Sequence, residues 1–125
     1  MELCSIGKLT TNKMEVKDTL VIAKEFKDNP GARDREDGPN SGQEFLEDLF
    51  IARFNKAIEE KYIILVDLTG VWGYPSSFIS GSFGKLSMER GAELLLTHLK
   101  FKSDNNPLNV DKVINEIKNP TPPKK

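Results

Sequence analysis

The stretch from Ile63 to Leu86, IILVDLTGVWGYPSSFISGSFGKL, decides the fold. It opens with four branched apolar residues, which Asp67 follows at once. Such a run, apolar on both sides, predicts a central parallel strand that is covered on each face. Glycines and Pro75 then predict a tight connection, and a helix begins at Ser76 or Ser77. Open α/β sheets place binding sites where a strand leads into a helix, because free backbone N–H groups point outward there.

Length and composition predict one globular domain. The chain has 125 residues, of which 38% are hydrophobic and 30% charged, and this is enough for a single core. We expect residues 1–118 to form the domain and NPTPPKK, residues 119–125, to form a disordered tail. The net charge of −1 argues against binding to nucleic acid or to an anionic membrane surface.

Several classes of site are not predicted. Cys4 is the single cysteine, so the sequence favours neither an intramolecular disulfide nor a cysteine zinc site. No cofactor or metal motif is present, and no apolar run has the length of a membrane span. The N-terminus lacks the apolar core of a signal peptide, and we therefore expect a cytoplasmic protein.

The N-terminal third predicts two strands and a long loop. Residues 2–9 and Thr19 to Phe26 are read as strands that form an antiparallel hairpin at one edge of the sheet. Residues 27–42 are rich in Pro, Gly and charge, which predicts a surface loop. Loops of this length are functional or mobile. The loop is either a plain connection, or Arg33 and Arg35 reach over the strand–helix corner and hold an anionic group.

Two longer helices are expected around the central strand. Ser41 and Glu44 have the spacing of a capping box, which predicts a helix from there to about Glu60 with one apolar, core-facing side. The helix after the central strand contains Gly81 and Gly84, and each glycine costs roughly 1 kcal/mol relative to Ala in a helix interior. We expect another element to pack closely at these glycines.

The C-terminal part predicts a short helix over residues 92–98, a strand over 99–102 and a final helix capped by Asn109. The complete pattern predicts an α/β fold with a four-stranded mixed sheet, an N-terminal hairpin, and three to four helices packed on the sheet.

The order of elements and the segment VDLTGVWGYPSSF resemble the STAS fold of anti-sigma-factor antagonists. In that fold a strand ending in Asp and a Gly-Val turn lead to paired serines at a helix start. The match is closer to a bacterial and phage family, the STAS-like domain of unknown function. The residues that carry this resemblance, from Thr19 to Leu86, are Arg33, Asp37-Gly38, Ser41-Gly42, Phe45, Asp67, Ser77-Phe78 and Phe83-Gly84-Lys85-Leu86.

The resemblance implies a non-enzymatic regulatory or protein-binding module that switches partners with an ATP-binding, kinase-like protein. Ser77 or Ser76 would be the switch, although Pro75 and Phe78 flank the serines where the antagonists carry Asp and Gly. The alternative for these serines is that they only cap the helix. The remaining candidates for the binding surface are Asp67, Trp72, Tyr74, Arg33 and Arg35.

Two other functions stay open. The domain is a small phosphate- or nucleotide-binding domain that uses the helix start near Ser76, or it is a phage or mobile-element protein acting against a host. For a hydrolase, the single imidazole, His98, is far in sequence from Ser77. No paired-carboxylate motif is present either, so no catalytic residue is predicted.

Overall fold

Three parallel strands form one sheet in the order β2-β3-β4 in the computed structural model, which describes residues 14–71 and 73–120. The strands are β2 (Val16–Val21), β3 (Ile63–Asp67) and β4 (Leu99–Lys102). The predicted central position of the strand after Tyr62 is confirmed, because β3 pairs with both neighbours.

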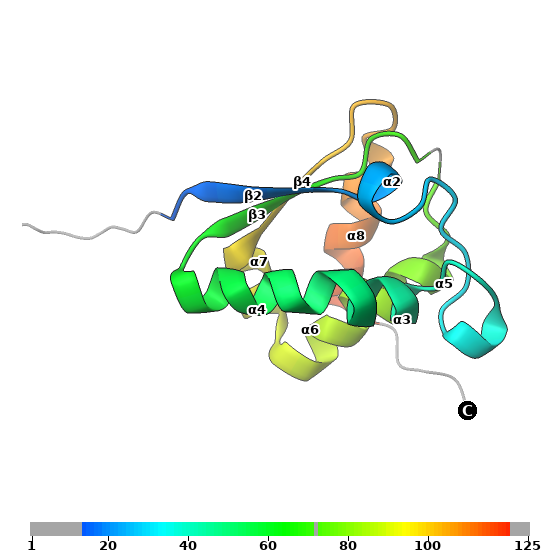
Figure 1. Ribbon diagram of the computed structural model, residues 1–125, viewed down its shortest axis with the longest axis horizontal. Coiled ribbons are helices and arrows are strands. Elements are labelled where there is room, and N and C mark those ends of the chain that lie inside the picture. The colour runs from blue at the N-terminus through cyan, green and yellow to red at the C-terminus, as the bar shows by residue number, and fades with distance from the viewer. Residues whose placement is uncertain (1–13, 72, 121–125) are drawn as a thin grey trace, which may run out of the picture.

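The long helices lie on one side of the sheet (Figure 1). On this side the aligned residues Leu20 and Val66 are fully buried, whereas Lys100 and Lys102 alternate out to solvent on the other side. The expectation of a strand covered on each face is therefore confirmed for one face only. On the other face Ile63 is buried, but Leu65 is only half-buried. The reason is topological. Two successive right-handed crossovers that step in the same direction place their helices on the same face.

Each crossover contains one long helix with a π-helical turn inside it. The first long helix, residues 42–60, comprises α3 (Gly42–Phe45), the π turn Leu46–Phe50 and α4 (Ile51–Glu60). The second long helix, residues 76–90, comprises α5 (Ser76–Ile79), the π turn Ser80–Gly84 and α6 (Lys85–Arg90). The shorter elements are α2 (Ile22–Glu25), a 3₁₀ turn (Arg35–Asp37), α7 (Ala92–His98) and α8 (Leu108–Lys118).

The predicted close approaches at the helical glycines are confirmed. A Cβ atom on Gly81 would lie 2.4 Å from the carbonyl oxygen of Arg33, and one on Gly84 would lie 2.7 Å from a carboxylate oxygen of Glu116. The loop before the first long helix and α8 thus pack directly on the second long helix. The helix accepts two glycines because side chains at these positions would hold its neighbours away.

An aromatic cluster fills the space between the two long helices. The Phe45 ring stacks on Phe50 at 5.4 Å between ring centroids and lies 5.7 Å from Phe78 and 5.8 Å from Phe83. All four rings are fully buried. The apolar side predicted for the first long helix therefore faces the core, and the cluster fixes the position of the second helix against the first.

The second predicted strand is shorter than expected. It ends at Val21 instead of Phe26, and Ile22–Glu25 form α2. The Glu25 carboxylate accepts a hydrogen bond from the Val21 N–H (3.0 Å), which stabilises a helical turn where alternating residues suggested a strand. The described sheet has three parallel strands and not four mixed ones. The predicted strand over residues 2–9, and with it the N-terminal hairpin, lies outside the described residues.

The C-terminal elements agree with prediction except at one cap. The short helix and the last strand form as expected, but α8 begins at Leu108 after Pro107, and Asn109 does not cap it. A proline has the fixed φ angle that suits a helix start. The Asn109 side chain is instead fully buried and has no hydrogen-bond partner among the described residues. The helix ends at Lys118, and residues 121–125 of the predicted tail lie outside the described part.

Candidate functional site at the start of the second long helix

Two side-chain hydrogen bonds fix the loop between β3 and α5. The half-buried Asp67 ends β3, and its carboxylate accepts a hydrogen bond from the Thr69 N–H (3.0 Å). The Tyr74 hydroxyl donates to the carbonyl oxygen of Leu68 (3.2 Å). These bonds at both ends of the loop position the helix start that follows. Trp72 lies outside the described residues.

Tyr74 is an anchor of this loop, because its ring is 1% exposed and packs 6.0 Å from the Phe78 ring. Burial, with a smaller effect of the Asp67 carboxylate, raises the pKa of the Tyr74 hydroxyl well above its ordinary value. The phenol stays protonated and keeps its hydrogen bond. The Tyr74 side chain is therefore part of the core beneath the candidate surface and not part of the surface.

The helix start at Ser76 is open. Pro75 is the N-cap, no side chain caps the helix, and Ser76 and Ser77 are exposed. The first helical N–H with a partner is that of Ile79, which donates to the Pro75 carbonyl (3.2 Å). No described residue accepts a hydrogen bond from the N–H groups of Ser76, Ser77 or Phe78. The two serines therefore do not act as caps. Two of the unpartnered N–H groups belong to the exposed Ser76 and Ser77, whereas Phe78 is fully buried.

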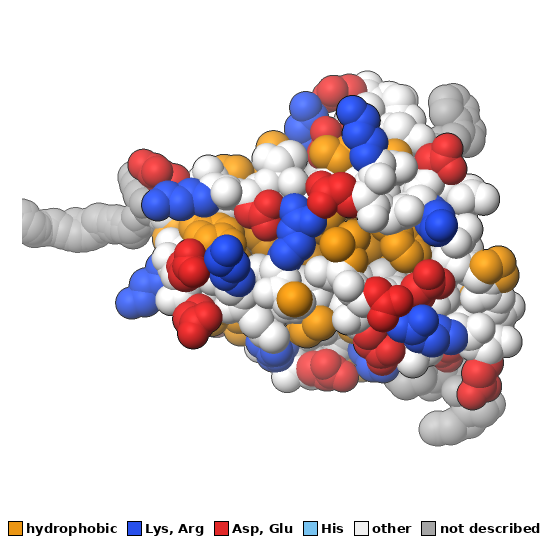
Figure 2. Space-filling model, viewed as in Figure 1, with side chains coloured by type: hydrophobic (Ala, Val, Ile, Leu, Met, Phe, Trp, Pro, Cys, Tyr) orange, Lys and Arg blue, Asp and Glu red, His pale blue; other side chains and the backbone are white. Residues whose placement is uncertain are grey.

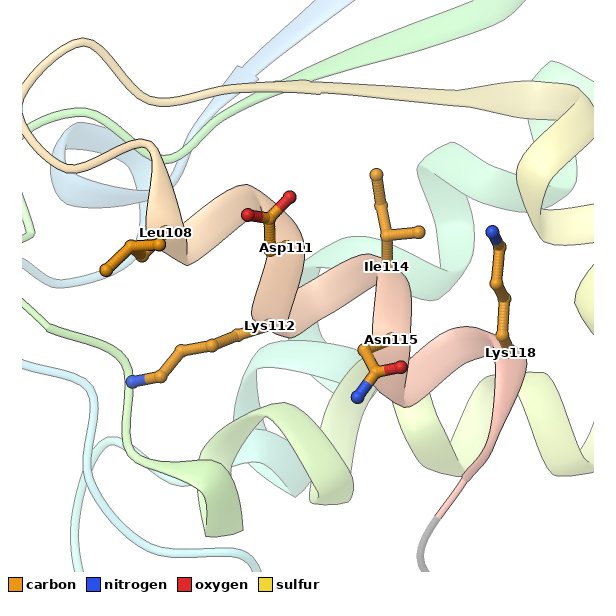
Figure 3. Close-up of a pocket in the computed structure, with 6 residues that line it drawn as sticks. All are labelled: Leu108, Asp111, Lys112, Ile114, Asn115 and Lys118. Carbon is orange, nitrogen blue, oxygen red and sulfur yellow. The ribbon is translucent and has the colours of Figure 1, made fainter.

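A small hollow of about 190 Å³ adjoins this start. Ser76 and Ile79 line one side, and Lys112, Asn115 and Glu116 of α8 line the other. The Lys112 ammonium donates to the Tyr74 carbonyl (3.2 Å), and Figure 3 shows its side chain extending from α8 toward the loop before α5. No sequence motif marks Lys112 or Asn115, since only the fold brings α8 beside Ser76.

A larger hollow of about 490 Å³ runs along α8, but its lining comes from that one helix (Figure 3). Its residues include Leu108, which is 67% exposed. A surface formed by a single exposed helix does not enclose a ligand. The smaller hollow at Ser76 has walls from two helices and is the better candidate site.

The two arginines of the loop lie in different places. The Arg35 guanidinium contacts Asp48 (2.8 Å) and Glu47 (3.4 Å) on the first long helix, and these acids raise its pKa. Arg33 lies against Gly81, five positions after Ser76 and hence on another side of the second long helix. The structure therefore brings neither arginine to the hollow at Ser76.

His98 and Ser77 lie at opposite ends of the sheet. The buried imidazole precedes the first residue of β4, and its Nδ1 atom is 2.9 Å from the carbonyl oxygen of Tyr62. Ser77 instead follows the carboxyl end of β3, which runs parallel to β4. His98 therefore cannot act as a base for Ser77. Within residues 14–71 and 73–120, no three His, Cys, Asp or Glu side chains gather as metal ligands would.

Acidic and basic side chains are interleaved on the face of the molecule shown in Figure 2. This distribution agrees with the net charge of −1 and leaves no broad field of one sign on that face. None of the helices in the described residues combines the length and the apolar character that crossing a membrane requires.

A family model for the STAS-like domain of unknown function (DUF4325) matches residues 41–109, which is more than half of the chain. The chain belongs to this family. The match to the STAS-like domain includes Ser41, Asp67 and the helix start at Ser76, and it extends past the predicted limit at Leu86. It begins after Arg33. Comparisons with curated proteins and with solved structures find no match.

Proposed function

We propose that this STAS-like domain is a non-catalytic regulatory module that binds a protein partner at the start of the second long helix. One observation carries the proposal. Ser76 and Ser77 are exposed at a helix start, and their own backbone N–H groups have no partner among the described residues. These donors and the helix dipole favour an acceptor or an anionic group from outside.

Phosphorylation of either serine would change this surface strongly. A phosphoryl group adds about 1.5 to 2 negative charges, and at a helix start the dipole and the free N–H groups stabilise it. A phosphate on Ser76 would lie beside the Lys112 ammonium, whereas Ser77 is outside the hollow that Lys112 lines. A phosphate on Ser77 would therefore face an incoming partner and alter its binding more.

The resemblance to anti-sigma-factor antagonists supports a kinase-like, ATP-binding partner for this surface. The test is capture from the cells that encode the domain, with the wild-type chain and the Ser77→Asp variant as bait. Thr97→Asp is the matched control, because Thr97 is an exposed hydroxyl residue on α7.

We expect phosphopeptide mapping to find phosphate on Ser77 or Ser76. A kinase-like protein should be retained by the wild-type chain and by Thr97→Asp, and it should be lost with Ser77→Asp. Absence of phosphate from both serines, together with identical captures by all three baits, contradicts the proposal.

The hollow at Ser76 favours a second candidate function, the binding of a small phosphate-bearing ligand. Its volume of about 190 Å³ is below the 300–1,000 Å³ that is typical of ligand pockets, so it fits a phosphoryl group better than a whole nucleotide. Thermal-shift measurements with nucleotides and inorganic phosphate test this function. A rise in melting temperature that Lys112→Gln abolishes supports it, and no rise across the panel contradicts it.

A further inference from the structure

A separate pocket of about 310 Å³ lies between the loop at Arg33 and the second long helix. The loop contributes Arg33 and Asp34, and the helix contributes a row of residues with helical spacing. This row consists of Gly81, Lys85, Met88 and Glu89. The row spans eight positions, or about 12 Å at 1.5 Å per residue. None of these residues lines the hollow at Ser76.

Arg33 differs from the other arginines of the chain, all of which are described. Arg33 is half-buried, yet its guanidinium has no ion pair or hydrogen bond with any described residue. The other three are engaged, Arg35 by Glu47 and Asp48, Arg53 by Asp18 and Glu25, and Arg90 by Asn55. A half-buried guanidinium without an acceptor is the group of this pocket that a ligand would satisfy.

The backbone of Arg33 is nevertheless fixed. Its carbonyl oxygen accepts a hydrogen bond from the Gln43 N–H (2.9 Å), and its Cγ atom lies 3.0 Å from the position of a Cβ on Gly81. The pocket thus holds the base of the side chain and leaves the guanidinium free. Binding a ligand would order few additional bonds, which lowers the entropic cost of association.

The charges around the pocket select the kind of ligand. Lys85 is a second half-buried cation without a partner among the described residues, while Asp34 and Glu89 bring two acids to the same rim. These four charges sum to zero, which disfavours an anion with several charges. Met88 is 44% exposed and offers an apolar wall.

We propose that this pocket binds a single carboxylate that is attached to an apolar group. The Arg33 guanidinium and the Lys85 ammonium would hold the carboxylate, since an arginine fork matches its two oxygens. The Met88 side chain and the backbone at Gly81 would contact the apolar group. The carboxylate comes from a free organic acid or from the C-terminus of a peptide.

The test is an NMR titration of the ¹⁵N-labelled full chain with hexanoate and with its neutral analogue, hexanamide. Hexanoate should produce saturable shifts at the Gly81 and Lys85 amides and at the Arg33 side chain, and hexanamide should not. Arg33→Gln should weaken hexanoate binding at least tenfold. Arg35→Gln is the matched control and should change it less than twofold, because Arg35 contacts acids outside the pocket.

The same spectra show whether each variant is folded. Acetyl-alanyl-leucine distinguishes the two sources of the carboxylate: a peptide C-terminus is favoured if it binds at least tenfold more tightly than hexanoate, and a free acid is favoured otherwise. The proposal is overturned if hexanamide binds as well as hexanoate or if Arg33→Gln and Arg35→Gln bind equally. Absence of saturable shifts with both carboxylates at millimolar concentration also overturns it.

Discussion

The two long helices begin in opposite ways. At the first start every early N–H has a partner: Gly42 donates to Ala32 (2.8 Å), Gln43 to Arg33 (2.9 Å), and Glu44 to the Ser41 hydroxyl (3.0 Å). Ser41 is fully buried. At the second start, the N–H groups of residues 76–78 have no acceptor among the described residues, and both serines are exposed.

The difference shows that one topology supports two kinds of helix start. The loop of residues 31–41 folds back over the first start, and its ends are joined by a hydrogen bond from the Gly31 N–H to the Asn40 carbonyl (2.9 Å). No described segment covers the second start in this way. A free N–H that faces water costs little, because water can satisfy it. The first start therefore contributes to stability, and the second is available for binding.

The largest expected effect on stability is at the start of the first long helix. A Cβ atom on Gly42 would lie 2.4 Å from the Phe78 carbonyl oxygen and 2.8 Å from the Gly81 carbonyl carbon, and backbone atoms cannot move aside cheaply. We expect Gly42→Ala to lower the free energy of unfolding by about 3 kcal/mol. The measurement is urea denaturation.

Gly73, beside the open start, is the matched control for this substitution. Apart from Gly73 itself and its chain neighbours, no atom of the described residues lies within 4 Å of the position of a Cβ on Gly73, so Gly73→Ala should stay within about 0.5 kcal/mol of wild type. Equal effects at the two glycines would contradict the difference between the two starts.

The first long helix is also tied to the sheet by Arg53. Its guanidinium contacts Asp18 (2.7 Å), which is on β2, and Glu25. Because removal of Arg53 leaves a half-buried carboxylate without its partner, Arg53→Met should cost about 2 kcal/mol at pH 7. Arg33→Gln removes no ion pair and should change stability by about 0.5 kcal/mol or less. A similar loss in both variants would contradict this account of the arginines.

The Arg53 contact also predicts a dependence on pH. The hydrogen bond from Arg53 lowers the pKa of Asp18 in the folded chain below its ordinary value of about 3.9. This contribution to stability is present above the unfolded pKa and is lost as the pH falls through the folded pKa. Wild type should therefore lose more stability than Arg53→Met between pH 5 and pH 2, as measured by urea denaturation across that range.

A smaller effect is expected from the serines themselves. Ser41→Ala removes the hydroxyl that accepts from the Glu44 N–H and should cost about 1 kcal/mol. Ser76→Ala and Ser77→Ala remove exposed hydroxyls that cap nothing and should stay within about 0.5 kcal/mol of wild type. Thermal unfolding of the three variants checks this order. A loss of stability at Ser76 or Ser77 equal to that at Ser41 would mean that a serine side chain also caps the second long helix.

Local patterns were sufficient to predict the central strand, the helix start at Ser76 and the cap at Ser41, because each depends on neighbouring residues. Gly81 and Gly84 were also informative. Glycine destabilises a helix interior relative to alanine, and close packing of another element explains why it occurs at both positions. The partners of these sites depend on distant segments. No sequence pattern predicts that Lys112 lies beside Ser76, or that Arg33 and Arg35 lie in different places.

Two predictions about the strands were incorrect, for different reasons. The alternation in residues 19–26 suggested a strand, but the contact between the Glu25 carboxylate and the Val21 N–H favours a helical turn. The apolar run of β3 suggested two covered faces, whereas the direction of the two crossovers leaves one face without helices in the described residues. The second outcome is set by topology that a local pattern does not contain, whereas the first depends on a contact between residues four positions apart.

Amide hydrogen exchange, measured by NMR on the wild-type chain, compares the two helix starts most directly. The amides of Gly42, Gln43 and Glu44 should exchange about a hundredfold or more slowly than those of the exposed Ser76 and Ser77, because only the former donate to protein acceptors. Equal protection of the two sets would contradict an open start at Ser76, and with it the surface on which the proposed function depends.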